Sequence, residues 1–517
     1  MPRLATAPAM LLAILGGLAT DAAFPGRSWW PLAPVGVALL LLALRGRGVF
    51  GGMGTGLLWG LSFFLPHLYW AHPAAGLVPW FLLGFAQALF IAVFGGMQSL
   101  AHRWTLVQAR PWLGAILTTA LWVSVEQLRG VAPFGGLPWG MLAFSQTSGP
   151  LLRAASLGGV VLISAVVVLL AVLTAHMLVA LRRGSVWRAG LAVCAGAIIL
   201  LASAIVPVNT RAEAGHLRVA AVQGNVPGTG LDAFAVRRDV VERHAAGTEA
   251  LAERFDPGDL DVVLWPENSS DVDPRVDAAT ATLIDDAARA VDAPILVGTQ
   301  RYTENHRYNE SVLWEPGQGV TDVYTKQHPA PFAEYIPLRD LARRVTDAVD
   351  LVTVDMLAGT EPGIIELASD RHGRTVPLAV GICFEVAYSD IVREAVVEGG
   401  ELIVIPTNNA SFGYTQESEQ QLAMSVFRAV EHARATVHVS TVGKSALIAP
   451  NGVIIDSGGH FTAEQLSEAL PLRTSLTLAT RLGPWPAIAA AILAGLGLLG
   501  AVAGRRVAPG RALGGLS

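Results

Sequence analysis

Eight apolar stretches constrain the fold of this 517-residue chain more than any other feature. A helix needs roughly 20 mostly apolar residues to cross about 30 Å of hydrocarbon. Stretches near this length lie at about residues 6–23, 30–45, 50–70, 76–99, 112–128, 156–181, 187–207 and 484–503. We therefore expect a membrane protein with seven spans in residues 1–207, and a final span with a cytoplasmic tail in residues 484–517.

The positions of the arginines predict how these spans are oriented. Loops rich in Lys and Arg stay on the cytoplasmic side of a membrane. With the N-terminus inside, eleven arginines fall on the cytoplasmic side and three on the other side. Both termini are therefore expected in the cytoplasm, and residues 208–483 on the outer face.

The charge of the chain is concentrated in this outer segment. Residues 208–483 contain 22 basic and 39 acidic side chains, a formal charge of −17. Such an acidic domain argues against nucleic acid as a partner. The two cysteines, Cys194 and Cys383, lie in an apolar stretch and in the charged domain, so a structural disulfide is not expected. Because no Cys/His spacing typical of zinc occurs, we expect neither a metal nor another cofactor.

The outer segment has the pattern of an α/β domain. Short apolar runs alternate with stretches of helical periodicity, which predicts a single domain built of packed layers. Strands are expected at 217–223, 260–265, 294–298, 319–324, 376–382 and 402–406, and helices at 235–254, 275–291, 386–398 and 417–435.

Three reactive side chains follow predicted strands of this domain. Glu267, Lys326 and Cys383 each lie at or just after a strand end, where α/β folds commonly build their sites. Lys326 is one of only two lysines in a chain whose other basic residues are arginines, which suggests that an ammonium is required there. A helix directly after Cys383 would offer amide groups to an oxyanion and favour a thiolate. Together these residues provide a nucleophile, a base and an oxyanion stabiliser.

Each of these residues also has an ordinary structural explanation. A lone cysteine at a strand end is often a small buried hydrophobic residue. Glu267 would then cap a turn, and Lys326 would be a surface charge. The apolar loop of about residues 129–155, which contains Trp139, is either a re-entrant connector or a lipid-facing lip beside the active site.

Longer strings around the three residues resemble one family. These strings are Leu-Trp-Pro-Glu-Asn at 264–268, Lys-Gln-His-Pro-Ala-Pro-Phe-Ala-Glu-Tyr-Ile-Pro at 326–337 and Gly-Ile-Cys-Phe-Glu at 381–385. They are similar to the three catalytic blocks of the nitrilase superfamily, and the arrangement of spans resembles its apolipoprotein N-acyltransferase family. The resemblance implies a transmembrane helical bundle of about eight spans that carries an extracytoplasmic nitrilase-like αββα sandwich.

The resemblance also assigns roles to individual residues. It implies that Glu267 is the general base, Lys326 the oxyanion stabiliser and Cys383 the nucleophile. Glu334 would be a supporting carboxylate near Lys326, and Glu385 a second one beside the thiol. The residues expected to contact substrate are Trp139, Tyr335, Phe384 and Phe412, and loops at 338–357 and 412–414 are expected to act as lids.

The implied reaction joins two lipid-anchored substrates in the bacterial inner membrane. A phospholipid would donate a fatty acyl group to Cys383, and the α-amine of a diacylglyceryl-cysteine at a lipoprotein N-terminus would accept it. The enzyme is expected to be a monomer. One alternative is a membrane-tethered amidase or nitrilase that hydrolyses small amides, and another is a transporter or sensor whose outer domain only binds a ligand.

Overall fold

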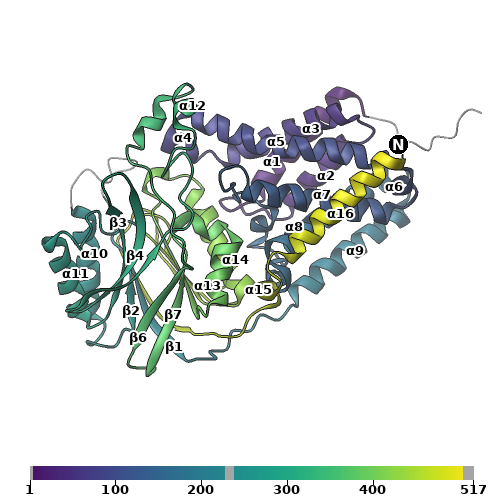
Figure 1. Cartoon of the computed structure of the whole chain (residues 1–517). Helices are drawn as coiled ribbons and strands as arrows, with labels where there is room; N and C mark the ends of the chain where they lie inside the picture. Colours follow the sequence, from purple (N-terminus) through teal and green to yellow (C-terminus); the bar gives the residue numbers. More distant parts are fainter. Residues whose placement is uncertain (1–3, 227–237, 505–517) are drawn as a thin grey trace, which may run out of the picture.

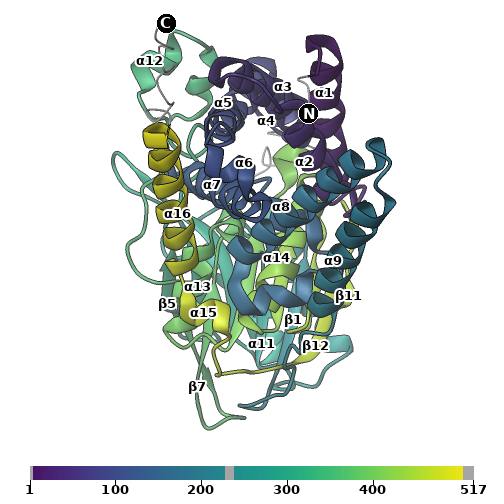
Figure 2. The ribbon, with the colours of Figure 1, turned by 90° about the vertical axis from the view of Figure 1, so that its right-hand side faces the viewer.

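A computed structural model of the protein describes residues 4–226 and 238–504. The cytoplasmic tail expected after the last span lies mostly in residues 505–517, outside the described residues. The described chain forms a helical part and a sandwich domain, which contact each other along one side (Figure 1). The end of the last helix lies at the end of the helical part that is remote from the sandwich domain (Figures 1 and 2).

Every predicted apolar stretch contains a helix. These helices are α1 (Thr6–Ala22), α2 (Leu32–Ala43), α3 (Val49–His67), α5 (Leu77–Ala101), α7 (Pro111–Val131), α8 (Ala155–Arg182), α9 (Val186–Ala204) and α16 (Trp485–Ala503). Short helices α4 (Ala71–Ala75) and α6 (Thr105–Ala109) lie between them. Among the described residues, five helices are long and apolar enough to cross a membrane: α3, α5, α8 with the turn before it, α9 and α16. Helices α1 and α2 are apolar but have only 17 and 12 residues, so eight spans remain a prediction.

The sandwich domain contains two six-stranded sheets within the described residues. The first sheet has the order β12 (Glu464–Pro471), β1 (His216–Gln223), β2 (Val262–Leu264), β3 (Ile295–Tyr302), β4 (Arg307–Glu315) and β5 (Gly319–Thr325). The second has the order β11 (Ile454–Ser457), β10 (Ala446–Ile448), β9 (Thr436–Ser440), β8 (Leu402–Thr407), β7 (Arg374–Val380) and β6 (Ile364–Ser369). The central strands β1, β2 and β3 run parallel, as do β7, β8 and β9.

Helices cover the outer faces of the two sheets. An apolar cluster that includes Val219, Leu264, Leu378 and Val404 fills the space between the sheets. Helices α10 (Asp239–Glu249) and α11 (Ala278–Val291) pack on the first sheet, while α13 (Ser389–Val397) and α14 (Glu417–His432) pack on the second. The predicted αββα order of layers is therefore confirmed.

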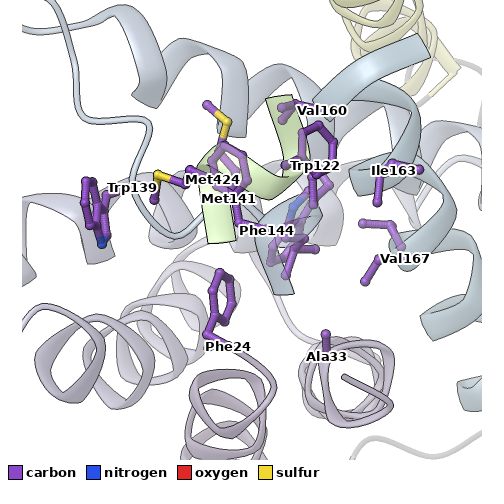
Figure 3. Packing of buried hydrophobic residues seen from close by; sticks show 14 of the residues in the cluster. Phe24, Ala33, Trp122, Trp139, Met141, Phe144, Val160, Ile163, Val167 and Met424 are labelled. Atoms are coloured by element: carbon purple, nitrogen blue, oxygen red, sulfur yellow. The ribbon is translucent and has the colours of Figure 1, made fainter. Parts of the chain in front are cut away.

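Helix α14 joins the sandwich domain to the helical part. All but one of its residues, Glu419, are buried, and Met424 and Phe427 belong to the same apolar cluster as Trp122, Phe144 and Ile163 of the helical part (Figure 3). The burial of a continuous apolar surface is the main favourable contribution to such an interface. The two parts therefore share one core rather than touching through a polar surface.

A break in α8 adds a polar contact to this junction. Gly158 and Gly159 leave helical geometry, and Gly159 has a φ of 59°. The interruption frees the backbone N–H of Val160, which donates to Glu431 Oε1 of α14 at 3.3 Å. Arg428 pairs with the other oxygen of the same carboxylate. A side chain at position 159 would put its Cβ 2.1 Å from Glu431 Oε1.

We expect Gly159→Ala to destabilise the protein by about 1–3 kcal/mol, because alanine is strained at positive φ and its Cβ would displace Glu431. Thermal unfolding of the full chain in detergent measures the effect. Gly190→Ala in α9 is the matched control, since its Cβ would meet nothing within 4 Å. A melting temperature equally high in both variants would contradict this account of the junction.

Candidate active site

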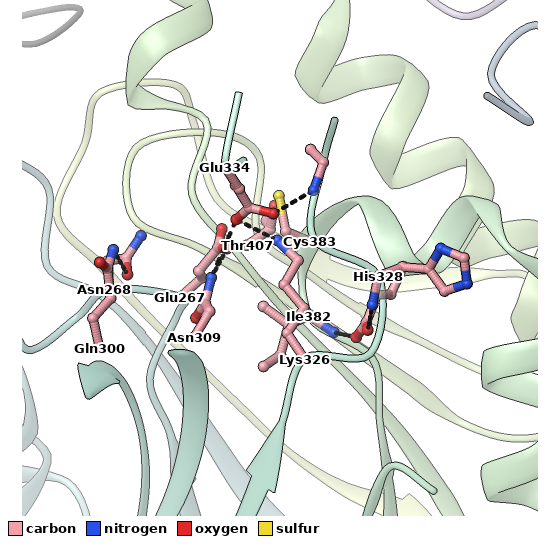
Figure 4. Close-up of polar contacts among 12 residues, drawn as sticks. Glu267, Asn268, Gln300, Asn309, Lys326, His328, Glu334, Ile382, Cys383 and Thr407 are labelled. Carbon is pink, nitrogen blue, oxygen red and sulfur yellow. Dashed lines mark hydrogen bonds and ion pairs between the residues drawn. The ribbon is translucent and has the colours of Figure 1, made fainter. Parts of the chain in front are cut away.

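Three loops after strands bring the predicted catalytic residues together. Glu267 follows β2 and Lys326 follows β5 of the first sheet, while Cys383 follows β7 of the second. Their side chains point into one shared space (Figure 4). All three are buried, with exposed fractions of 4% for Glu267, 1% for Lys326 and 7% for Cys383. The site thus lies at the carboxyl ends of parallel strands, where the sequence predicted it.

The Lys326 ammonium lies between two carboxylates. Its Nζ donates to Glu334 Oε1 at 2.8 Å and to Glu267 Oε1 at 3.2 Å. Asn309 Nδ2 also donates to Glu267 Oε1 at 2.6 Å, and the backbone N–H of Ala330 donates to Glu334 Oε2 at 2.6 Å. Burial alone would lower the pKa of Lys326, but the charges of Glu267 and Glu334 offset this and hold the pKa well above its ordinary value. The lysine is therefore a fixed positive charge.

The same surroundings keep the Cys383 thiol protonated. Burial raises its pKa, and the negative charge of Glu267 raises it further, while Lys326 acts in the opposite direction. A protonated thiol is a weak nucleophile, so this sulfur needs a base to remove its proton. Glu267 is the carboxylate that the arrangement offers for this purpose.

The backbone at Cys383 differs from the predicted strand followed directly by a helix. Strand β7 ends at Val380, and Cys383 opens a short 3-10 turn, η6 (Cys383–Ala387), before α13 begins at Ser389. The helix predicted at 386–398 is α13, which ends at Val397, so the amide groups directly after Cys383 belong to the turn η6 rather than to a helix N-terminus. Cys383 instead has a φ of 57°, a strained conformation for a residue with a Cβ, which is typical of residues held in place for function.

Glu385 maintains this turn. Its Oε2 accepts from the backbone N–H of Ile382 at 2.7 Å and from the Tyr324 hydroxyl at 2.9 Å. Its Oε1 accepts from the N–H groups of Gln327 and His328, at 2.6 and 3.0 Å. The carboxylate therefore ties the loop after Lys326 to the turn that carries Cys383. Its hydrogen bonds support the backbone of the site, whereas the sequence placed it beside the thiol.

Two further groups near the sulfur were missed by the sequence analysis. Gln421 of α14 donates from Nε2 to Cys383 Sγ at 3.5 Å, and its Oε1 accepts from Thr407 Oγ1 at 2.8 Å. Glu417, one turn earlier on the same helix, is fully buried. The i, i+3 and i+4 spacing of Glu417, Gln420 and Gln421 places these polar side chains on one face of α14, and this was the available signal.

Three of the four predicted substrate contacts gather in one aromatic cluster. Its members are Trp70, Trp139, Phe384 and Phe412, with ring centroids 4.8–5.8 Å apart. Trp70 comes from the helical part and was not predicted. Tyr335 lies elsewhere and donates to the Phe134 carbonyl at 3.4 Å.

Most of the loop that contains Trp139 is packed inside the protein, whereas Val131 and Phe134 are exposed. Trp139 is fully buried, and its Nε1 donates to Gln420 Oε1 of α14 at 2.6 Å. Arg129 Nη1 holds the loop through the carbonyls of Leu137 and Trp139, at 2.7 and 2.8 Å. In the loop expected to act as a lid, by contrast, Leu338, Leu341 and Leu351 are exposed.

We expect Glu267→Gln to move the pH profile of Cys383 alkylation to lower pH. The substitution removes a negative charge that raises the thiol pKa and leaves the Lys326 charge in place. Rates with iodoacetamide, measured in a Cys194→Ala background, report this change. Glu398→Gln, which neutralises an exposed carboxylate after α13, should leave the profile unchanged. An unmoved profile in Glu267→Gln would show that its charge does not act on the sulfur.

Comparisons with known proteins agree with this division of the chain. A family model described as "Apolipoprotein N-acyltransferase N-terminal domain" matches residues 16–173, and one described as "Carbon-nitrogen hydrolase" matches residues 218–475. Among solved structures, the chain is similar to an amidase from Nesterenkonia sp., at 16% identity and a TM-score of 0.38, covering 51% of this chain and 94% of that one.

Relatives match along nearly the whole length. A protein of Mycolicibacterium smegmatis named apolipoprotein N-acyltransferase is 37% identical over 504 residues, which cover 91% of this chain and 81% of the relative. One of Azotobacter vinelandii with the same name is 30% identical over 537 residues, covering 98% of each. The resemblance seen in the sequence is thus confirmed, and the chain belongs to the apolipoprotein N-acyltransferase family, with a carbon-nitrogen hydrolase domain next to its apolar helices.

Proposed function

We propose that this membrane protein is an acyltransferase that moves a fatty acyl chain from a phospholipid to a lipoprotein. The acceptor is the N-terminal α-amine of a diacylglyceryl-cysteine, and the acyl group passes through a thioester on Cys383. The observation that carries the proposal is a buried Glu267–Lys326–Cys383 site that shares its surroundings with a helical part apolar enough to enter a membrane. The names of the relatives support the same reaction.

The first half-reaction acylates the cysteine. Glu267 takes the thiol proton, and the sulfur attacks the carbonyl carbon of the donor ester. Lys326 stabilises the negative charge that develops on the carbonyl oxygen. When the tetrahedral intermediate collapses, the lysophospholipid oxygen leaves and receives the proton from Glu267. Cys383 then carries the acyl group as a thioester.

The second half-reaction transfers the acyl group to the amine. The α-amine attacks the thioester carbonyl, and Lys326 again stabilises the oxyanion. Glu267 takes a proton from the attacking nitrogen, the sulfur leaves, and the thiol regains that proton. The products are an amide and free Cys383, so one base serves both halves in turn.

The apolar surroundings suit substrates that remain in a membrane. Extracting a lipid chain into water would cost about 0.8 kcal/mol per methylene. The aromatic cluster of Trp70, Trp139, Phe384 and Phe412 connects the helical part to the residue after the nucleophile. We assign Phe384, Phe412 and Trp139 to the walls around the acyl chain, and Tyr335 to the outer rim. Excluding water from this region would protect the thioester from hydrolysis.

The proposal includes the orientation and the assembly. We place the sandwich domain on the outer face of the bacterial inner membrane, with both termini in the cytoplasm, because eleven of fourteen relevant arginines then lie inside. The end of α16 lies on the side away from the sandwich domain, which fits this orientation. Because each named site residue comes from this one chain, we propose that the enzyme acts as a monomer.

A transfer assay tests the function. We expect the full chain in mixed micelles to move label from the acyl chain of a phospholipid to a synthetic diacylglyceryl-cysteinyl peptide, as measured by the mass and label of the peptide. Cys383→Ala should abolish transfer, because no thioester forms, whereas Cys194→Ala should retain it. Hydrolysis of small amides without acyl transfer would instead support the amidase alternative and contradict the proposal.

A further inference from the structure

We propose that Gln421 is a further catalytic residue, whose side-chain N–H stabilises the sulfur anion of Cys383, and that Asn409 and Glu417 are positioning residues that orient it. The inference rests on the proposed function, because it concerns the same thiol in the same two half-reactions. In the first half the sulfur becomes a nucleophile, and in the second it becomes a leaving group. A donor to the sulfur anion therefore assists both.

The geometry fixes which end of the Gln421 amide faces the sulfur. Gln421 is fully buried, and its Oε1 accepts from Thr407 Oγ1 and Asn409 Nδ2, both at 2.8 Å. Because these two groups donate, the oxygen of the amide must lie toward them, and the nitrogen must lie toward Cys383 Sγ at 3.5 Å. The distance is within the range for a hydrogen bond to sulfur.

Asn409 is fixed in the same way. Its Nδ2 carries two hydrogens, one donated to Gln421 Oε1 and the other to Glu417 Oε2 at 2.6 Å. Its Oδ1 accepts from Ser440 Oγ at 2.5 Å. Rotating this amide would place its Oδ1 against Gln421 Oε1 and break the hydrogen bond between them. The hydrogen-bonded series Glu417–Asn409–Gln421 therefore holds the N–H donor against the sulfur. It acts through uncharged groups, whereas Lys326 and Glu267 act through their charges.

The protonation of Glu417 fits this arrangement. Burial raises its pKa, the Asn409 hydrogen bond opposes that effect, and the charge of Glu267 adds to it, giving a pKa of about 8. Near neutral pH the acid is therefore uncharged and accepts a hydrogen bond without placing another negative charge near the thiol. An ionised carboxylate there would raise the Cys383 pKa. The Gln421 amide and the protonated Glu417 are both uncharged. They therefore favour the sulfur anion and leave the charges of the Lys326 cluster unchanged.

The pH profile of Cys383 alkylation tests the role of Gln421 without any lipid. In the full chain with Cys194→Ala, we expect Gln421→Leu to move the profile to higher pH. At neutral pH the variant should react about tenfold more slowly with iodoacetamide, the effect of losing one hydrogen bond to an anion. Gln420→Leu is the matched control, since this neighbour is equally buried on the same helix but bonds Trp139, and its profile should stay unchanged.

Variants of Glu417 test the positioning role. Glu417→Gln keeps an oxygen that accepts from Asn409, so below pH 8 its alkylation profile should match that of the unsubstituted protein. Glu417→Leu should move the alkylation profile to higher pH, toward the profile of Gln421→Leu. Gln421→Met, which has a similar size but neither an N–H donor nor a charge, serves if Gln421→Leu does not fold. A folded Gln421 variant with an unshifted profile would overturn the inference. Failure of the unsubstituted protein to transfer acyl groups would instead overturn the proposed function, because alkylation requires no substrate.

Discussion

The site depends on one buried ion cluster, the Lys326 ammonium between the carboxylates of Glu267 and Glu334. Removing one partner of such a buried pair commonly costs about 3–5 kcal/mol, because the remaining charge is left without compensation. Burial raises the pKa of Cys383, and the negative charge of Glu267 in this cluster raises it further, so the thiol is protonated at rest. In the proposed mechanism Glu267 is the base for this thiol, and the same lysine stabilises the oxyanion.

The site also depends on the position of helix α14. Consecutive residues of this helix serve different surroundings: Gln421 reaches the nucleophile, and Gln420 reaches Trp139 of the helical part. About three turns later, Glu431 accepts from the broken backbone of α8. A displacement of the apolar helices would therefore change the position of α14 and, with it, the polar groups behind the sulfur. This connection gives a physical reason for the helical part and the sandwich domain to share one core.

Much of this arrangement followed from the sequence. Apolar length predicted the helices, alternation predicted a layered α/β domain, and the family resemblance implied the αββα sandwich. The position after strand ends predicted the meeting of Glu267, Lys326 and Cys383. What could not be predicted depends on contacts between distant segments. Glu385 was expected to be a supporting carboxylate beside the thiol, but only the folded chain shows that it accepts from the N–H groups of Gln327 and His328. Trp70 lies in the turn between α3 and α4, and Gln421 lies in α14. The sequence pattern around them indicates burial, but not which neighbour each side chain meets.

The central claim, that Cys383 carries the acyl group, is tested most directly by the intact mass of the purified protein after incubation with a phospholipid and no acceptor. The account predicts one added fatty acyl mass per chain, located on the peptide that contains Cys383 and removed by hydroxylamine, as expected of a thioester. An unchanged mass, or an adduct on another residue that resists hydroxylamine, would contradict it.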